Sequence, residues 1–251
     1  MNIFVMMLVL ILVATFLALL VPIIRGMKIE RRIKDICMWK GYRYYGENIP
    51  DAHFLFQGTG MDRGDRHRAQ YGIGRRIEGL DIRFFDWEVI HEDDENQWSE
   101  YFKVAAIHKQ FNFYGYIHVR REGMLDKFDT IFGSNDLDFE NKAFSDRFFV
   151  RANPERFGYD FFHPRMMEVF LEFPDVNVIV TGRSIVIFQR GSFAQRGTLL
   201  RIFEGEKPIQ TWIDGTTYML VKIHKNIPKI MLPHKGPLIQ GDARRPQPES
   251  R

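Results

Sequence analysis

The side chains best suited to chemistry lie between residues 137 and 170, where phenylalanines recur among arginines and acids. A guanidinium binds a carboxylate or a phosphate through two parallel hydrogen bonds, so arginines beside aromatic rings can form a groove for an anionic ligand. The arginines that would line this groove are Arg147, Arg151, Arg156 and Arg165. They are the candidate ligand or interaction surface of the chain.

The same stretch has a second interpretation, a packed core, which we favour. Burying one ring stabilises a fold by roughly 1.5–3 kcal/mol, which is a strong reason for a domain of short elements to use many of them. The rings available are Phe139, Phe144, Phe148, Phe149, Phe157, Phe161 and Phe162. The four arginines would then pair with Glu140, Asp146, Glu155 and Glu168.

A second candidate is the stretch GTGMDRGDRHRAQYGIGRR at residues 58–76, whose glycines and arginines invite comparison with phosphate-binding loops. A P-loop requires Gly-Lys followed by Ser or Thr, and none follows the first three glycines. A dinucleotide fingerprint has a third glycine where this chain has Arg63. We therefore expect a solvated, mobile loop at 58–67 and the start of a strand at YGIGRR, with a phosphate loop as the alternative.

Metal and nucleophile motifs are missing. HEDDEN at residues 91–96 lacks the EF-hand spacing, so we expect a polar hairpin tip. His108 and His118 can face each other on neighbouring strands, but there is no H-E-x-x-H, and the single cysteine, Cys37, permits no zinc–cysteine cluster. No serine lies in a G-x-S-x-G elbow. The sequence predicts no catalytic residue, no cofactor and no metal site.

These candidates must be positioned by a domain that we place at residues 68–228. Alternating runs from about 68 to 120 predict an antiparallel meander of short strands. After residue 121 we expect short helices around the strand FFVRA, then a hairpin of VNVIVTG and SIVIFQRG, then a helix at about 208–225. We expect a linker and mobile loop at 39–67 and a disordered tail at 229–251.

The N-terminal run differs from the rest of the chain. Residues 3–24 carry no charge, and a helix of this length spans about 33 Å, enough for the hydrocarbon core of a bilayer. A cleaved signal peptide is the alternative, but a basic n-region and a small-residue cleavage site are missing. We therefore predict a single-pass transmembrane helix, continued to residue 38 by a basic juxtamembrane helix.

A basic cluster follows this run on its C-terminal side only. Cytoplasmic flanks carry such an excess, which predicts an N-terminus outside and a cytoplasmic domain at the cell membrane. The cluster can contact anionic lipid headgroups, or it can act as a topology signal alone. Its members are Arg25, Lys28, Arg31, Arg32 and Lys34. The net charge of +3 comes from this cluster and the C-terminal tail, so it gives no support for nucleic-acid binding.

Two motifs resemble an uncharacterised family of bacterial membrane-anchored proteins that carry a domain of unknown function. An E-x-x-x-F-x-x-x-F-x-V pattern is followed by a P-x-M-M-E helix and a hairpin, within about residues 68–190. The matching residues are Glu140, Phe144, Phe148, Val150, Pro164, Met166, Met167 and Glu168. The resemblance implies membrane anchoring and brings no activity or catalytic residue.

The expected fold class is α+β: an N-terminal transmembrane helix followed by an antiparallel-sheet domain with short helices. The expected function is a non-enzymatic binding or scaffold domain at the cytoplasmic membrane face, with the lipid bilayer and an unknown protein as partners. The alternative is a membrane-associated enzyme that acts on an anionic or lipid-linked substrate.

Overall fold

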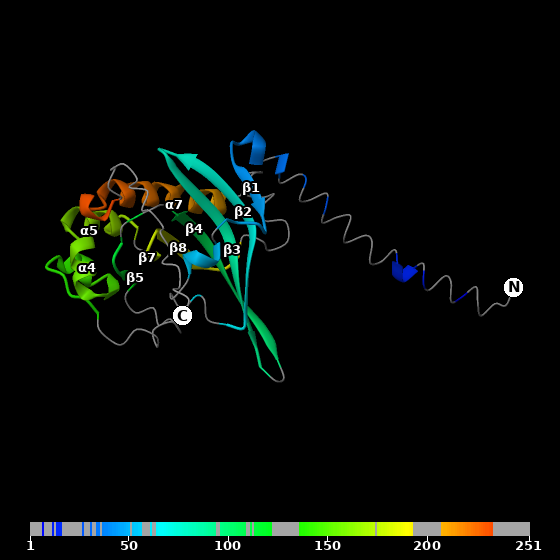
Figure 1. Cartoon of the computed structure of the whole chain (residues 1–251), viewed down its shortest axis with the longest axis horizontal. Coiled ribbons are helices and arrows are strands. Elements are labelled where there is room, and N and C mark those ends of the chain that lie inside the picture. The colour runs from blue at the N-terminus through cyan, green and yellow to red at the C-terminus, as the bar shows by residue number, and fades with distance from the viewer. Residues whose placement is uncertain are drawn as a thin grey trace, which may run out of the picture.

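The computed structural model describes residues 37–50, 52–56, 61, 64–93, 96–108, 111, 113–121, 136–173, 175–192 and 207–232, with a few positions between 7 and 35. Eight strands form one sheet in the order β1-β2-β3-β4-β8-β7-β5-β6, and every neighbouring pair is antiparallel (Figure 1). The strands are β1 (Arg43–Gly46), β2 (Arg66–Ile77), β3 (Leu80–Glu92), β4 (Gln97–His108), β5 (Tyr116–Arg121), β6 (Phe148–Asn153), β7 (Asn177–Thr181) and β8 (Ser184–Arg190).

The predicted hairpins are confirmed. Glu78 and Gly79 connect β2 to β3 with φ of 48° and 78°, the two positive values that suit a tight hairpin turn. At the HEDDEN stretch β3 pairs with β4 up to Glu92 and Gln97, and the Asn96 N–H donates to the Asp93 carboxylate over 2.7 Å. This β3–β4 hairpin projects past the other strands (Figure 1). The predicted β7–β8 hairpin turns at Gly182, which has φ of 49°.

The predicted meander stops at β4. β8 pairs with β4, and β7 lies between β8 and β5. In β8, residues 185–188 are consecutive, apolar and buried. Side chains on both faces of this strand are therefore shielded from water, as is usual for a strand in the middle of a sheet whose two faces are both packed. His108 and His118 therefore do not face each other. His108 lies opposite Ser184 and His118 opposite Ile179, and the strands β8 and β7 separate the two histidines.

Two hydrophobic cores cover the two faces of the sheet. Alternation along β3 divides its side chains, so Phe84 lies in the larger core and Phe85 in the smaller one. The larger core lies under the helices α3 (Lys142–Ser145), α4 (Glu155–Phe161), α5 (Pro164–Leu171) and α7 (Lys207–Asn226), with a 3-10 turn at Lys229–Met231. The smaller core lies under α2 (Ala52–Leu55).

The predicted packed core at 137–170 is confirmed for five of its seven phenylalanines, whereas Phe139 and Phe149 are only partly buried. Phe144, Phe148, Phe157, Phe161 and Phe162 are all buried in the larger core. Their rings meet edge to face or tilted, for example Phe144 and Phe162 with centroids 5.1 Å apart.

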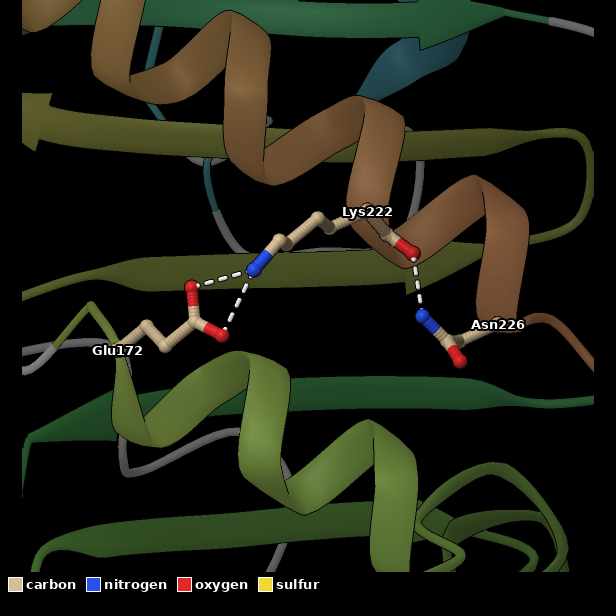
Figure 2. Close-up of polar contacts among 3 residues, drawn as sticks. All are labelled: Glu172, Lys222 and Asn226. Atoms are coloured by element: carbon tan, nitrogen blue, oxygen red, sulfur yellow. Dashed lines mark hydrogen bonds and ion pairs between the residues drawn. The ribbon is translucent and has the colours of Figure 1, made fainter.

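The long helix α7 is tied to the end of α5. The Lys222 ammonium donates to both carboxylate oxygens of Glu172, at 2.7 and 2.6 Å, and this contact raises the pKa of Lys222 (Figure 2). The Asn226 side chain donates to the Lys222 carbonyl over 3.0 Å. The Asn226 carbonyl in turn lies 2.8 Å from His163 Nε2, at the start of α5. These contacts hold α7 beside α5.

The predicted fold class is wrong. The described chain is mostly β, an eight-stranded antiparallel sheet with few helices, most of them short. The helical stretches in 137–171 are short, as predicted: they last 4–8 residues each and place their buried side chains in the larger core.

The predicted transmembrane helix is corrected as well. Among the described residues, no helix combines the length and apolar character needed to cross a bilayer. Hydropathy counts apolar residues but does not establish that they form one continuous spanning helix. Of residues 3–24 the structure describes only Met7, Leu12 and residues 14–16, and the rest of the predicted span lies outside the described residues. We predicted the single-pass signal-anchor topology and the cytoplasmic location at the cell membrane from this span, so these two predictions are corrected together with it.

Candidate interaction surface

A helix that ends at residues 37–39 finishes in a turn that fixes its last side chains. The Tyr42 N–H donates to the Cys37 carbonyl over 2.7 Å, and the Gly41 N–H donates to the Met38 carbonyl over 3.2 Å. Gly41 has φ of +73°, a left-handed conformation that glycine adopts without strain. This pair of bonds is the Schellman arrangement at a helix C-terminus. The backbone from 37 to 42 is therefore held by its own hydrogen bonds.

Cys37 anchors this turn to the larger core. Its side chain is fully buried, and Tyr42 is buried beside it. Burial raises the pKa of the Cys37 thiol to about 12. Because the thiolate is the reactive form, the protonated thiol is a packing group at neutral pH. The Arg75 guanidinium lies 5.4 Å from the centre of the Tyr42 ring and adds a contact from β2.

Two large apolar side chains project from the anchored turn. Met38 is 72% exposed and Trp39 is 82% exposed. The Lys40 ammonium lies 5.9 Å from the centre of the Trp39 ring, and Arg43 is exposed at the start of β1. We call Met38, Trp39, Lys40 and Arg43 the Met38–Trp39 surface. It combines apolar contact area with positive charge, and exposed apolar groups rimmed by polar ones mark interaction sites.

β1 follows this surface and packs very closely on β2. A Cβ added at Gly74 would lie 2.5 Å from Tyr45 Cε2, and one added at Gly72 would lie 2.2 Å from Ile49 Cγ1. The predicted strand at YGIGRR is thus confirmed as part of β2. Its glycines admit the side chains of β1 and the following loop, so protein atoms fill the space that a phosphate would need.

The predicted lipid-contact cluster is described only in part. Arg31 and Lys34 are exposed, and the Lys34 ammonium lies 5.5 Å from the centre of the Tyr44 ring. Arg25, Lys28 and Arg32 lie outside the described residues.

The four predicted ligand-site arginines differ in their burial and in their described contacts. Arg147 is exposed and donates to the Leu171 carbonyl over 3.2 Å. Arg156 is exposed and lies 3.7 Å from the Asp160 carboxylate. Arg165 is exposed on α5, whereas Arg151 is buried on β6. Whether any of them contacts a ligand stays a prediction.

Sequence reasoning missed a buried pair of carboxylates on β3. Asp86 and Glu88 are both buried, two residues apart on one face of the strand. Gln70 Nε2 and the Tyr101 hydroxyl each donate to Glu88 over 2.9 Å. The hydrogen bond to Glu88 raises the pKa of Tyr101. Alternation in FFDWEVI was the available signal, because it places both acids on the face that Phe84 shares.

Lys103 completes this network from β4. It lies opposite Asp86 in the register, and its ammonium is 5.4 Å from the centre of the Trp212 ring on α7. Burial lowers the pKa of Lys103, and the Asp86 charge opposes that shift. The Ser192 hydroxyl donates to the Asp86 carboxylate. Because members on neighbouring strands engage each other, the network specifies strand register.

The remaining candidates have structural partners. His91 stacks on Trp98 in the β3–β4 hairpin, with ring centroids 5.0 Å apart, and His108 Nδ1 lies 2.8 Å from the Ser184 hydroxyl. Within the part of the chain that the structure describes, no three His, Cys, Asp or Glu side chains gather closely enough to hold a metal ion.

Comparison with known proteins gives one distant likeness. No protein-family model and no curated protein matches the chain. The crystal structure of the mycobacterial trehalose monomycolate transport factor A, TtfA, is similar with a TM-score of 0.45 and 15% identity, over 80% of this chain and 96% of that chain. This likeness to a bacterial protein is too distant to assign a family.

Proposed function

We propose that this protein is a non-enzymatic binding domain that holds an acidic segment of a protein partner at the Met38–Trp39 surface. The observation that carries the proposal is the 82% exposure of Trp39 on a turn whose backbone is fixed and whose neighbour, Cys37, is fully buried. A rigidly presented Trp loses little conformational freedom on binding, which is why such residues dominate interface energies.

The expected charge of the partner follows from Lys40, whose ammonium lies 5.9 Å from the centre of the Trp39 ring, and from two exposed cations close to it in the chain. Lys34, Lys40 and Arg43 are all exposed on this part of the chain. A positively charged interface rim attracts a negatively charged partner, and this attraction raises the association rate more than the affinity. The expected partner segment therefore places an apolar side chain on Trp39 and acidic side chains around it.

A protein segment fits this surface better than an anionic lipid surface. Among the described residues from 37 to 43, the exposed apolar part consists of two side chains.

The alternative of an enzyme acting on an anionic substrate has less support. It requires Arg147, Arg151, Arg156 and Arg165 in one site, and their described contacts lie in different places.

The proposal is tested by titrating the full chain with a labelled peptide of alternating glutamate and leucine. A lysine–leucine peptide and phosphatidylglycerol vesicles are the comparison ligands. Trp39→Ala should weaken binding of the acidic peptide about 30-fold, the loss typical of a hot-spot residue. Phe54→Ala removes a ring that is 66% exposed on α2 and should change nothing.

Two outcomes would contradict the proposal. Equal losses of peptide affinity in Trp39→Ala and Phe54→Ala would show that the peptide binds exposed aromatic rings without specificity. Binding to the vesicles with none to the acidic peptide would assign the surface to lipid instead.

A further inference from the structure

The β3–β4 hairpin presents a second exposed indole on a fixed support. Trp98 is 46% exposed, although the His91 ring stacks on it with centroids 5.0 Å apart. At the turn, the Asp93 N–H donates to the Asn96 carbonyl over 2.9 Å, and the Asn96 N–H donates to the Asp93 carboxylate over 2.7 Å. This end of the hairpin projects past the other strands (Figure 1). The Trp98 ring is therefore held at a part of the surface that another molecule can reach.

The projecting end of this hairpin is also acidic. Residues 92–95 are Glu-Asp-Asp-Glu, the only adjacent acidic residues in the sequence. Glu92 and Asp93 are exposed, and Arg66 offsets part of the negative charge by pairing with Glu92. We call the described residues 91–93 and 96–98 the hairpin tip. It combines an exposed apolar ring with negative charge, the two properties expected of the segment that binds the Met38–Trp39 surface.

The hairpin tip lies far from the Met38–Trp39 surface of its own molecule. Strand register places Arg43 opposite Gly74, and Gly74 opposite Arg83. Glu92 follows Arg83 by nine residues along β3, which is about 30 Å at the rise of an extended strand. Because both regions are attached to one sheet, this separation is built into the fold. A contact between the two regions therefore requires two molecules.

We propose that the Met38–Trp39 surface binds the hairpin tip of a second copy of this chain. Trp98 of the second copy supplies the apolar side chain that packs on Trp39, and the acidic residues beside it meet Lys40 and Arg43. This inference rests on the proposed function, because it names the partner of the same surface. The contact joins two different surfaces head to tail, so each molecule offers one half of the contact to each of two neighbours.

The test uses two variants of the full chain, each of which lacks one half of the contact. Trp39→Ala alters the Met38–Trp39 surface, and Trp98→Ala alters the hairpin tip. Each variant alone should lose about 30-fold in self-association affinity, measured by sedimentation velocity. An equal mixture of the two should form pairs and nothing larger, because the intact tip of one variant binds the intact surface of the other.

Two further variants complete the design. Phe54→Ala is the matched control, because it removes another exposed ring and should associate as the wild type does. Lys40→Glu leaves both indoles in place and should also lose self-association, which covers the case in which Trp39→Ala disturbs the turn. Raised salt should weaken association of the wild type, because it screens charge pairs at an exposed contact.

Three outcomes would overturn the inference: a wild type that stays monomeric at every concentration, full self-association of Trp39→Ala or Trp98→Ala alone, or a mixture that forms no pairs. The glutamate–leucine peptide separates this failure from failure of the proposed function. If the peptide binds at Trp39 while the wild type stays monomeric, the partner is another protein and only this inference fails. If the peptide does not bind, the proposed function fails as well.

Discussion

The two glycines under β1 give the sharpest stability prediction. Gly74→Ala places a methyl group 2.5 Å from Tyr45 Cε2, and Gly72→Ala places one 2.2 Å from Ile49 Cγ1. Neither glycine has a left-handed backbone, so any cost of the substitution comes from the contact itself. Overfilling a packed contact costs about 1–3 kcal/mol. For a domain of this size, about 2 kcal/mol lowers the Tm by roughly 4–8 °C.

The structure also predicts where the strain is relieved. β1 is a four-residue edge strand, and moving it away from β2 removes the clash more easily than moving β3 or β4. Hydrogen exchange should therefore speed up at the β1 amides before it does in the central strands. Because β1 directly follows the Met38–Trp39 surface, partner binding should weaken as well.

A double-mutant cycle supplies the control. Tyr45→Ala removes the ring that Gly74→Ala would strike, so the added methyl should cost much less in the Tyr45→Ala background. Thermal unfolding of the four proteins measures this coupling. An unchanged Tm for Gly74→Ala, or simple additivity in the cycle, would refute the close packing of β1 on β2.

Three further predictions concern single side chains. Gly215→Ala in α7 meets no atom within 4 Å and should raise the free energy of unfolding by up to about 1 kcal/mol in urea titrations. The Cys37 thiol should resist alkylation until the protein unfolds, and stability should fall as pH rises from 9.0 towards about 12, because only the unfolded thiol ionises readily in that window. Trp87→Ala removes a buried ring that donates to the Met61 carbonyl over 2.9 Å, and it should lower the free energy of unfolding by about 3–5 kcal/mol in chemical denaturation. Trp98→Ala should lower it far less, because the Trp98 ring is 46% exposed.

The local elements of the sheet could be predicted because their signals are local. Alternation and a short turn are enough to identify the β2–β3 and β7–β8 hairpins. The order of the strands could not be predicted in this way, because β8 reaches β4 across more than 70 residues of chain. The misplaced pairing of His108 with His118 shows the consequence.

The sequence did not indicate the Met38–Trp39 surface, because most of its residues lie in a stretch with the composition of a linker. WKGYRYYGENIP, from Trp39 to Pro50, was expected to be a linker because its glycines and proline interrupt the helical pattern. In the structure Gly41 ends a helix, Tyr42 is buried in the larger core, and Tyr44 and Tyr45 lie in β1. The burial of Cys37 and the hydrogen bonds of the turn fix the backbone at Trp39, and both are properties of the folded chain.

Chemical-shift mapping of the isotope-labelled full chain, titrated with the glutamate–leucine peptide, tests the proposed binding surface most directly. We expect the perturbed resonances to cluster at residues 37–43 and to include the Trp39 indole, with no comparable change for the lysine–leucine peptide. Perturbations centred on another face of the sheet, or none at saturating peptide, would contradict it.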